Sequence, residues 1–223
     1  MISILAITAG RPDLFANMLN SLRSTTKNFD MELIAVIDKD SECERIAENY
    51  EADVIDWSVK KRGALWSWNR ALQLSDGEIL IPAGDDQLFH PKWLDYALES
   101  HRDRLEGYGV VGMNDLAYDG NTQLATMFLF DRKYCKEKMG GVVAPPVYHY
   151  YCIDSELNAK AKSLGRFYWD KRSVVEHVHS AHGKRPLDSL DQEKMDAGWM
   201  EQDNRTFEER KASGFRVTWE PII

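Results

Sequence analysis

Two adjacent carboxylates, Asp85 and Asp86, directly follow an apolar run that ends near Gly84. Adjacent carboxylates repel each other, so their pairing at the end of a strand indicates a cation or a set of hydrogen-bond donors beside them. Mg²⁺ and Mn²⁺ favour oxygen ligands, and one carboxylate together with the phosphate oxygens of a nucleotide suits such an ion. The alternative is a solvated acidic turn that caps a helix from Pro91.

Two further apolar runs end in polar side chains. Asp38 ends the second run, where its carboxylate suits a hydrogen bond from the imide N–H of a nucleobase. The alternative for Asp38 is an Asx turn or the cap of the next helix. Thr8 and Arg11 follow the first run, where a hydroxyl and a guanidinium suit a base or a phosphate. The absence of GxGxxG and of GxxxxGKS/T argues against a dinucleotide enzyme and a P-loop NTPase.

Three histidines gather late in the chain. His177 and His179 are two residues apart on an expected strand, which places both side chains on one face. Two imidazoles on one face suit a metal site, with His182 as a third candidate, although single histidines are more often structural. A zinc hydrolase is disfavoured because the motif HExxH is missing from the sequence.

Asp154 opens an expected helix just after an aromatic stretch that includes Tyr150 and Tyr151. The plain interpretation of this aspartate is a helix N-cap. The functional interpretation is a general base, because sugars stack on aromatic rings and a neighbouring carboxylate would take the proton of a sugar hydroxyl. The residue types fit both interpretations.

The elements that must position these residues alternate, over the first hundred residues, between short apolar strands and amphipathic helices. We expect strands at 2–7, 33–37, 54–55 and 78–82, and helices at 14–22, around 46, at 64–74 and at 93–98. This alternation is typical of an α/β fold with a mostly parallel central sheet flanked by helices. In such a sheet the loops after the strands converge on one crevice, so the polar residues at the strand ends are expected to meet.

The second half of the chain is less regular. We expect strands at 110–113, 125–130 and 173–178, a helix from Asp154 to about Leu164, and one charged helix over 187–210. No linker separates two independent units. The sequence therefore predicts a single domain over 1–223, with a nucleotide-binding half at 1–100 and an acceptor-binding half at 101–223.

The composition is that of a globular protein. Of 223 residues, 43% are hydrophobic and 29% are charged, with 28 Lys and Arg against 36 Asp and Glu. The net charge of −8 argues against a general nucleic-acid-binding surface. Three widely spaced cysteines form no CxxC, and no apolar run approaches the roughly 20 residues of a membrane span. We therefore expect a cytoplasmic protein with free thiols and no membrane span.

In their order and spacing, these motifs resemble the GT-A nucleotide-sugar glycosyltransferases, especially family 2. The resemblance covers Ile2 to about Lys184 and is carried by the segments ISILAITAGRPDLF, LIAVIDKDS, RGALWSWNRALQLSDGEILIPAGDD, CIDSELNAKAKSLG and EHVHSAHGK. It implies a divalent ion, Mn²⁺ or Mg²⁺, and a nucleoside-diphosphate sugar as donor. A UDP-sugar is expected because Asp38 matches the aspartate that contacts uracil in that family.

The resemblance also implies a role for each candidate residue. Asp86 is the expected ligand of the metal ion on the diphosphate, and His177 or His179 is a further ligand, with no choice made between them. Asp154 is the expected catalytic base. The expected donor-binding residues are Thr8, Arg11, Asp38, Arg62, Asn69 and Asp85.

The expected activity is an inverting, metal-dependent transfer of a sugar from a nucleotide sugar to an acceptor hydroxyl. The alternatives are a sugar-phosphate nucleotidyltransferase, disfavoured by a first loop with one Gly and no nearby Lys, and a non-catalytic nucleotide- or sugar-binding module. The acceptor stays open among a saccharide, a lipid, a protein and a modified nucleobase. Its site is expected to include the aromatic patch 148–151 and the basic pairs 132–133 and 184–185.

Overall fold

A computed structural model describes residues 1–38, 40–58, 60–117 and 124–221 of the chain. Its strands are β1 (Ile2–Thr8), β2 (Met31–Asp38), β3 (Val54–Ser58), β4 (Ile79–Gly84), β5 (Gln87–Phe89), β6 (Val110–Asn114), β7 (Met127–Asp131) and β8 (Phe167–His177). Its α-helices are α1 (Pro12–Thr25), α2 (Ser41–Asn49), α3 (Ala64–Leu74), α4 (Trp93–Leu105), α5 (Arg132–Lys138), α6 (Ile153–Ser163), α7 (Ser189–Asp196) and α8 (Trp199–Ala212).

The strands form one sheet in the order β3-β2-β1-β4-β7-β6-β8-β5. β1 lies between β2 and β4 and is parallel to both, and β3 is parallel to β2. β7 is antiparallel to β4 and to β6, whereas β8 is parallel to β6 and antiparallel to β5. Four of these seven pairings are parallel, which confirms the expected α/β fold with a mostly parallel sheet.

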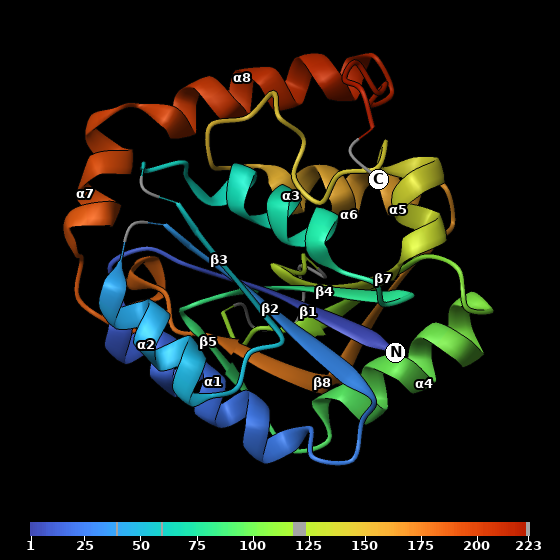
Figure 1. The fold of residues 1–223 in the computed structure, drawn as a ribbon. Coiled ribbons are helices and arrows are strands. Elements are labelled where there is room, and N and C mark those ends of the chain that lie inside the picture. The colour runs from blue at the N-terminus through green and yellow to red at the C-terminus, as the bar shows by residue number, and fades with distance from the viewer. Residues whose placement is uncertain (39, 59, 118–123, 222–223) are drawn as a thin grey trace.

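Helices cover both faces of the sheet, as the continuous apolar strands require. α1, α2 and α4 lie on one face and α3, α5 and α6 on the other, with α8 outside α3 and α6 (Figure 1). Phe15, Met18 and Trp93 are fully buried in the core on the first face. Leu72 and Tyr134 are fully buried in the core on the second face. The site at the sheet edge therefore stands on a packed scaffold.

The charged C-terminal segment differs from the expected single helix. It forms two helices, α7 and α8, because Gly198 adopts a left-handed conformation with φ of 64° between them. This conformation suits glycine, which has no Cβ to clash with the backbone. The expected strand at 173–178 also begins earlier, at Phe167, and the two short elements β5 and α5 were not predicted. Elements of three and seven residues are too short to show a clear hydrophobic period.

No helix in the described part of the chain is long and apolar enough to cross a membrane.

Candidate active site

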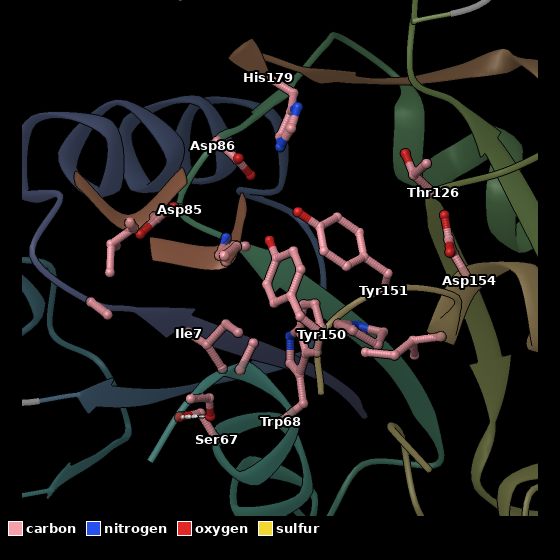
Figure 2. Close-up of a pocket in the computed structure, with 18 of the residues that line it drawn as sticks. Ile7, Ser67, Trp68, Asp85, Asp86, Thr126, Tyr150, Tyr151, Asp154 and His179 are labelled. Carbon is pink, nitrogen blue, oxygen red and sulfur yellow. Dashed lines mark hydrogen bonds between the residues drawn. The ribbon is translucent and has the colours of Figure 1, made fainter. Parts of the chain in front are cut away.

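A cavity of about 630 Å³ opens where β1, β2 and β4 end (Figure 2). This edge of a parallel sheet is the place where α/β folds bind ligands. Most of the sequence-predicted site residues line the cavity: Thr8, Arg11, Asp38, Arg62, Asp85, Asp86, Asp154, His177, His179 and His182. The structure therefore brings together side chains from the first 86 residues of the chain and from residues 154–182.

Asp85 is held by residues that follow the neighbouring strand. The hydroxyl of Thr8 donates a 2.9 Å hydrogen bond to one carboxylate oxygen of Asp85, and Arg11 lies 3.3 Å from the other. The same guanidinium is 3.8 Å from Asp86. Burial, followed by the neighbouring charge of Asp86, raises the pKa of Asp85, although Arg11 and Thr8 oppose the shift.

Asp86, His177 and His179 form a group that could hold a metal ion. Their candidate ligand atoms all lie within 4.8 Å of one another, and Nε2 of His177 is 3.4 Å from Asp86 Oδ1. Antiparallel pairing of β5 with β8 places Gln87 opposite His177 and so holds these residues together. The His182 ring centre lies 6.2 Å from that of His177 and 6.0 Å from that of His179, outside this compact group.

The charge states of Asp86 and His179 suit a cation. Burial alone would raise the pKa of Asp86, but the hydrogen bond and charge of His177, with the charge of Arg11, lower it. Burial and the adjacent His177 lower the pKa of His179 to about 4, so that imidazole is neutral at pH 7. Ionised carboxylates and neutral imidazoles are the forms that ligate divalent ions. In addition, Nδ1 of His177 is buried without a hydrogen-bond partner among the described residues.

Asp154 lies on the opposite side of the cavity from Asp85 and Asp86, with the rings of Tyr150 and Tyr151 between them (Figure 2). One carboxylate oxygen of Asp154 accepts a 2.8 Å hydrogen bond from the backbone N–H of Ser155. Burial raises the pKa of this carboxyl, although the Ser155 N–H and the charge of His177 oppose the shift. A partly buried carboxylate with a raised pKa is suited to accept a proton.

Asp38 and Arg62 lie together at the cavity. Both carboxylate oxygens of Asp38 accept hydrogen bonds of 2.8–2.9 Å from the backbone N–H groups of Arg62 and Gly63. These bonds fix the turn that leads into α3, so Asp38 has a structural role beside any contact with a base. The guanidinium of Arg62 lies 5.5 Å from the ring centre of Trp66.

Asn69 is the expected donor-binding residue that the structure does not bring to the cavity. Its side-chain N–H donates to the carbonyl oxygen of Ala144 at 2.7 Å, and its oxygen accepts from the N–H groups of Val143 and Ala144 at 2.9 and 3.1 Å. All of these partners belong to one backbone segment. Asn69 therefore ties α3 to the segment that precedes the tyrosines.

A comparison with sequence models of protein families agrees with this geometry. The sequence model of the family described as Glycosyl transferase family 2 matches residues 3–156, which is most of the chain. The chain belongs to glycosyl transferase family 2. Among curated protein sequences, none matches it.

Solved structures share the fold of this family 2 chain at low sequence identity. The mannosyltransferase PcManGT from Pyrobaculum calidifontis, in complex with GDP-Man and Mn²⁺, is 18% identical with a TM-score of 0.64, over 79% of this chain and 56% of that one. TarS 1–349 from S. aureus is 14% identical with a TM-score of 0.61, over 78% and 59% of the two chains. The family 2 chain thus covers less than two thirds of these two relatives.

Glucosyl-3-phosphoglycerate synthase from Mycobacterium tuberculosis, in complex with Mg²⁺ and UDP, is a third structural relative. It is 16% identical with a TM-score of 0.60, over 85% of this chain and 74% of that one. These likenesses confirm the expected GT-A fold for the family 2 chain.

Two expected parts of the acceptor site lie elsewhere in the family 2 chain. Arg132, the first residue of α5, donates to the carbonyl oxygens of Gly77 and Ser75 at 2.7 and 2.9 Å, so it joins α5 to the turn before β4 and does not line the cavity. Tyr148 is also absent from the lining, because its hydroxyl donates to buried Glu156 at 2.7 Å. Lys133 lies over the ring of Tyr108, likewise outside the cavity.

The second basic pair, 184–185, is committed to ion pairs. Lys184 lies 2.9 Å from Glu176 on β8. Arg185 lies 2.6 Å from Asp191 and 3.3 Å from Asp188. Neither residue lines the cavity, so this pair fixes the segment between β8 and α7.

The tyrosines that do line the cavity are held in place by α8. Asp203 is fully buried, and its carboxylate accepts hydrogen bonds of 2.7–2.8 Å from the backbone N–H groups of His149, Tyr150 and Tyr151. Nothing in the sequence marks this role of Asp203. A lone aspartate in a charged helix resembles any solvated side chain, and its partners are more than 50 residues away.

α7 is the second contributor that the sequence analysis missed. Arg11 donates to Asp188 at 2.8 and 3.1 Å and to Asp191 at 3.0 Å, across more than 170 residues of sequence. Arg11 therefore connects the acidic pair at the end of β4 with the first turn of α7. As a result, Lys194 and Glu193 of α7 also line the cavity.

Proposed function

We propose that this chain is an inverting, metal-dependent glycosyltransferase that moves a sugar from a UDP-sugar to an acceptor hydroxyl. One observation carries the proposal: the candidate metal group Asp86, His177 and His179 and the candidate base Asp154 line opposite sides of one cavity. An inverting transfer needs this separation, because the acceptor attacks the anomeric carbon from the side opposite the leaving diphosphate. Membership of family 2 supports the reaction class.

The metal group fits a divalent ion such as Mn²⁺ or Mg²⁺. Asp86 supplies an ionised carboxylate, and the buried, unpartnered Nδ1 of His177 is an atom that a ligand would satisfy. Solved relatives carry Mn²⁺ with GDP-Man and Mg²⁺ with UDP. A divalent ion bound here supplies Lewis-acid stabilisation of charge on the leaving diphosphate.

Asp154 is the proposed general base. The hydrogen bonds from Ser155 go to one carboxylate oxygen of Asp154, and the other carboxylate oxygen is proposed to accept the hydrogen bond of the acceptor hydroxyl. As the acceptor oxygen bonds to the anomeric carbon, Asp154 takes the hydroxyl proton. The bond between that carbon and the diphosphate oxygen breaks, and its electron pair leaves with UDP. Burial, which raises the pKa of Asp154, favours this proton transfer.

The donor is proposed to lie between the ends of β1, β2 and β4, with the acceptor on the side of Asp154. Thr8, Arg11 and Asp85 would contact the ribose and phosphates, and Asp38 and Arg62 the base. This arrangement keeps residues 1–100 as the proposed nucleotide half and 101–223 as the proposed acceptor half. Asn69 is proposed to act indirectly, through the backbone segment that it holds.

A cytoplasmic location is also proposed. Its support is chemical: Cys43, Cys135 and Cys152 are all free thiols. Free, partly buried cysteines are typical of a reducing compartment.

The proposal is tested by turnover. The chain is incubated with Mn²⁺ and a panel of UDP-sugars and GDP-sugars, and released nucleoside diphosphate is measured with and without simple saccharide acceptors. Release of UDP from one UDP-sugar is the expected result. Release of pyrophosphate from UTP and a sugar phosphate would instead identify a nucleotidyltransferase. Nucleotide binding without any turnover would identify a binding module.

Two substitutions separate the proposed roles. Asp154→Asn removes the base and is expected to lower kcat by about 10²–10⁴ without changing UDP affinity. Asp86→Ala removes a metal ligand and is expected to weaken Mn²⁺-dependent UDP binding. Asp196→Asn, on an exposed side chain at the end of α7, is the matched control and should leave both quantities unchanged. Full turnover in both site variants would contradict the assignment.

A further inference from the structure

Lys194 is a cation in the cavity that the sequence did not mark. It lies in the last turn of α7, beyond the residues that the family model matches, and it lines the same cavity as Asp86 and Asp154. Its ammonium nitrogen is 3.5 Å from the ring centre of Tyr150. The face of an aromatic ring attracts a cation, but the N–H groups of the ammonium still have no hydrogen-bond acceptor there.

The ammonium of Lys194 has no carboxylate within ion-pair distance among the described residues. Its neighbours on α7 differ, since Asp191 pairs with two arginines and Glu193 pairs with Lys61. A half-buried cation without a paired carboxylate is costly: burial, with the charge of Arg11, lowers the pKa of Lys194 to about 8, although the charges of Asp191, Asp86 and Asp85 oppose the shift. A charged group held in this way indicates that an anion completes the site.

The position of Lys194 is fixed by its own helix. Asp188 and Asp191 anchor the first turn of α7 to Arg11 and Arg185, and Glu193 anchors its middle to Lys61. α7 lies at the edge of the molecule (Figure 1), and these contacts hold it beside the cavity that its side chains Leu190, Glu193 and Lys194 line. Lys194 therefore lines the cavity from a helix that these ion pairs hold in place.

Arg11, the other cation near the acidic pair, is already committed. Its guanidinium lies within 4.0 Å of carboxylate oxygens from Asp85, Asp86, Asp188 and Asp191. Four carboxylates more than neutralise one guanidinium. An incoming diphosphate would therefore find little free positive charge on Arg11, whereas Lys194 keeps its charge and its three N–H donors.

We propose that Lys194 binds the diphosphate of the nucleotide sugar from the side of α7. This inference rests on the proposed function and adds a phosphate-binding residue to it. When the bond between the anomeric carbon and the diphosphate oxygen breaks, the electron pair stays on that oxygen. The ammonium of Lys194 then stabilises the charge of the departing nucleoside diphosphate by a charge-assisted hydrogen bond.

The experiment measures the affinities of UDP and uridine by calorimetry in the presence of Mn²⁺. Lys194→Met removes the charged Nζ and keeps an unbranched apolar side chain that is one atom shorter. It is expected to weaken UDP binding by about 10- to 100-fold, the size of one charge-assisted hydrogen bond. Uridine, which has no phosphate, should bind the variant and the wild type equally.

Lys133→Met is the matched control. Lys133 also lies over a tyrosine ring, 5.5 Å from the centre of Tyr108, but outside the cavity. This variant should bind UDP like the wild type. Thermal unfolding checks that each variant folds, and Lys194→Gln, a polar substitution of similar length, replaces Lys194→Met if the latter does not fold.

The outcomes separate the inference from the proposed function. Unchanged UDP affinity in the Lys194 variant, beside tight binding by the wild type, would overturn the inference alone. Equal weakening of UDP and uridine would also overturn it, because Lys194 would then only shape the cavity through Tyr150. If the wild type binds neither UDP nor GDP with Mn²⁺, the proposed function fails and the inference fails with it.

Discussion

Asp203 offers a sharp test of how the C-terminal helices support the site. Its buried carboxylate accepts three backbone N–H bonds of 2.7–2.8 Å from residues 149–151 and lies 3.1 Å from Nδ1 of His149. In Asp203→Asn, one oxygen becomes an NH₂ group that cannot accept a bond. Each oxygen of Asp203 makes two of these contacts, so the substitution removes two of them. The new NH₂ group then faces N–H groups that it cannot accept from.

The magnitude follows from these bonds. A hydrogen bond to a charged group contributes about 1.5–3 kcal/mol to stability. Taken at about 1.5 kcal/mol each, the two lost contacts lower the free energy of unfolding by about 3 kcal/mol. In a chain of this size that loss corresponds to a decrease in Tm of about 6–12 °C. Turnover should also fall, since Tyr150 and Tyr151 line the cavity.

Calorimetric unfolding and amide hydrogen exchange measure the two consequences. The amides that lose their acceptor in Asp203→Asn, either that of His149 or those of Tyr150 and Tyr151, are expected to lose protection. The control is Asp196→Asn, an exposed aspartate on α7, which should change the free energy of unfolding by less than about 0.5 kcal/mol. A Tm like that of the wild type, with the three amides still protected, would refute the reasoning.

Three further predictions follow from buried contacts and from the charge of the site. In the wild type, the carboxylate of Glu156 lies 2.6 Å from the buried guanidinium of Arg210. Glu156→Gln removes this charged partner and should lower the free energy of unfolding, measured by urea denaturation, by about 3 kcal/mol. Gly77→Ala should lower it by about 1–3 kcal/mol in the same assay, because the added Cβ would lie 2.4 Å from Oγ and 2.7 Å from the backbone nitrogen of Ser3. Chelation of metal by EDTA should weaken UDP binding measured by calorimetry, with no such effect in Asp86→Ala.

The sequence predicted the fold of the first hundred residues well, because its signals there are local. The helix expected at 64–74 has those bounds in the structure, and the apolar runs at 2–7 and 33–37 lie within β1 and β2. The two strands are continuous apolar runs, and the helix of eleven residues is long enough to show a helical hydrophobic period. Once a parallel sheet is inferred, the convergence of Thr8, Asp38 and Asp85 on one edge follows from its geometry.

The C-terminal contribution could not be predicted in the same way. The ion pairs of Arg11 with Asp188 and Asp191 join residues 177 and 180 positions apart, and nothing local marks them. Asp188 and Asp191 also form the capping box of α7, so their residue types are explained by helix capping and do not point to the site. Asn69 shows the opposite error: a polar residue in a matching segment was expected to bind the donor, and it holds a backbone segment instead.

The charges of the site explain why these distant segments belong together. Asp85, Asp86, Asp188 and Asp191 surround Arg11, and Arg185 is the second guanidinium within reach. Four carboxylates around two guanidinium groups leave an excess of negative charge, which repels a bare diphosphate. A divalent ion at Asp86 and the ammonium of Lys194, more than 100 residues further along the chain, would each offset part of that repulsion. Donor binding in this chain is therefore proposed to depend on α7 as much as on the residues that the family model matches.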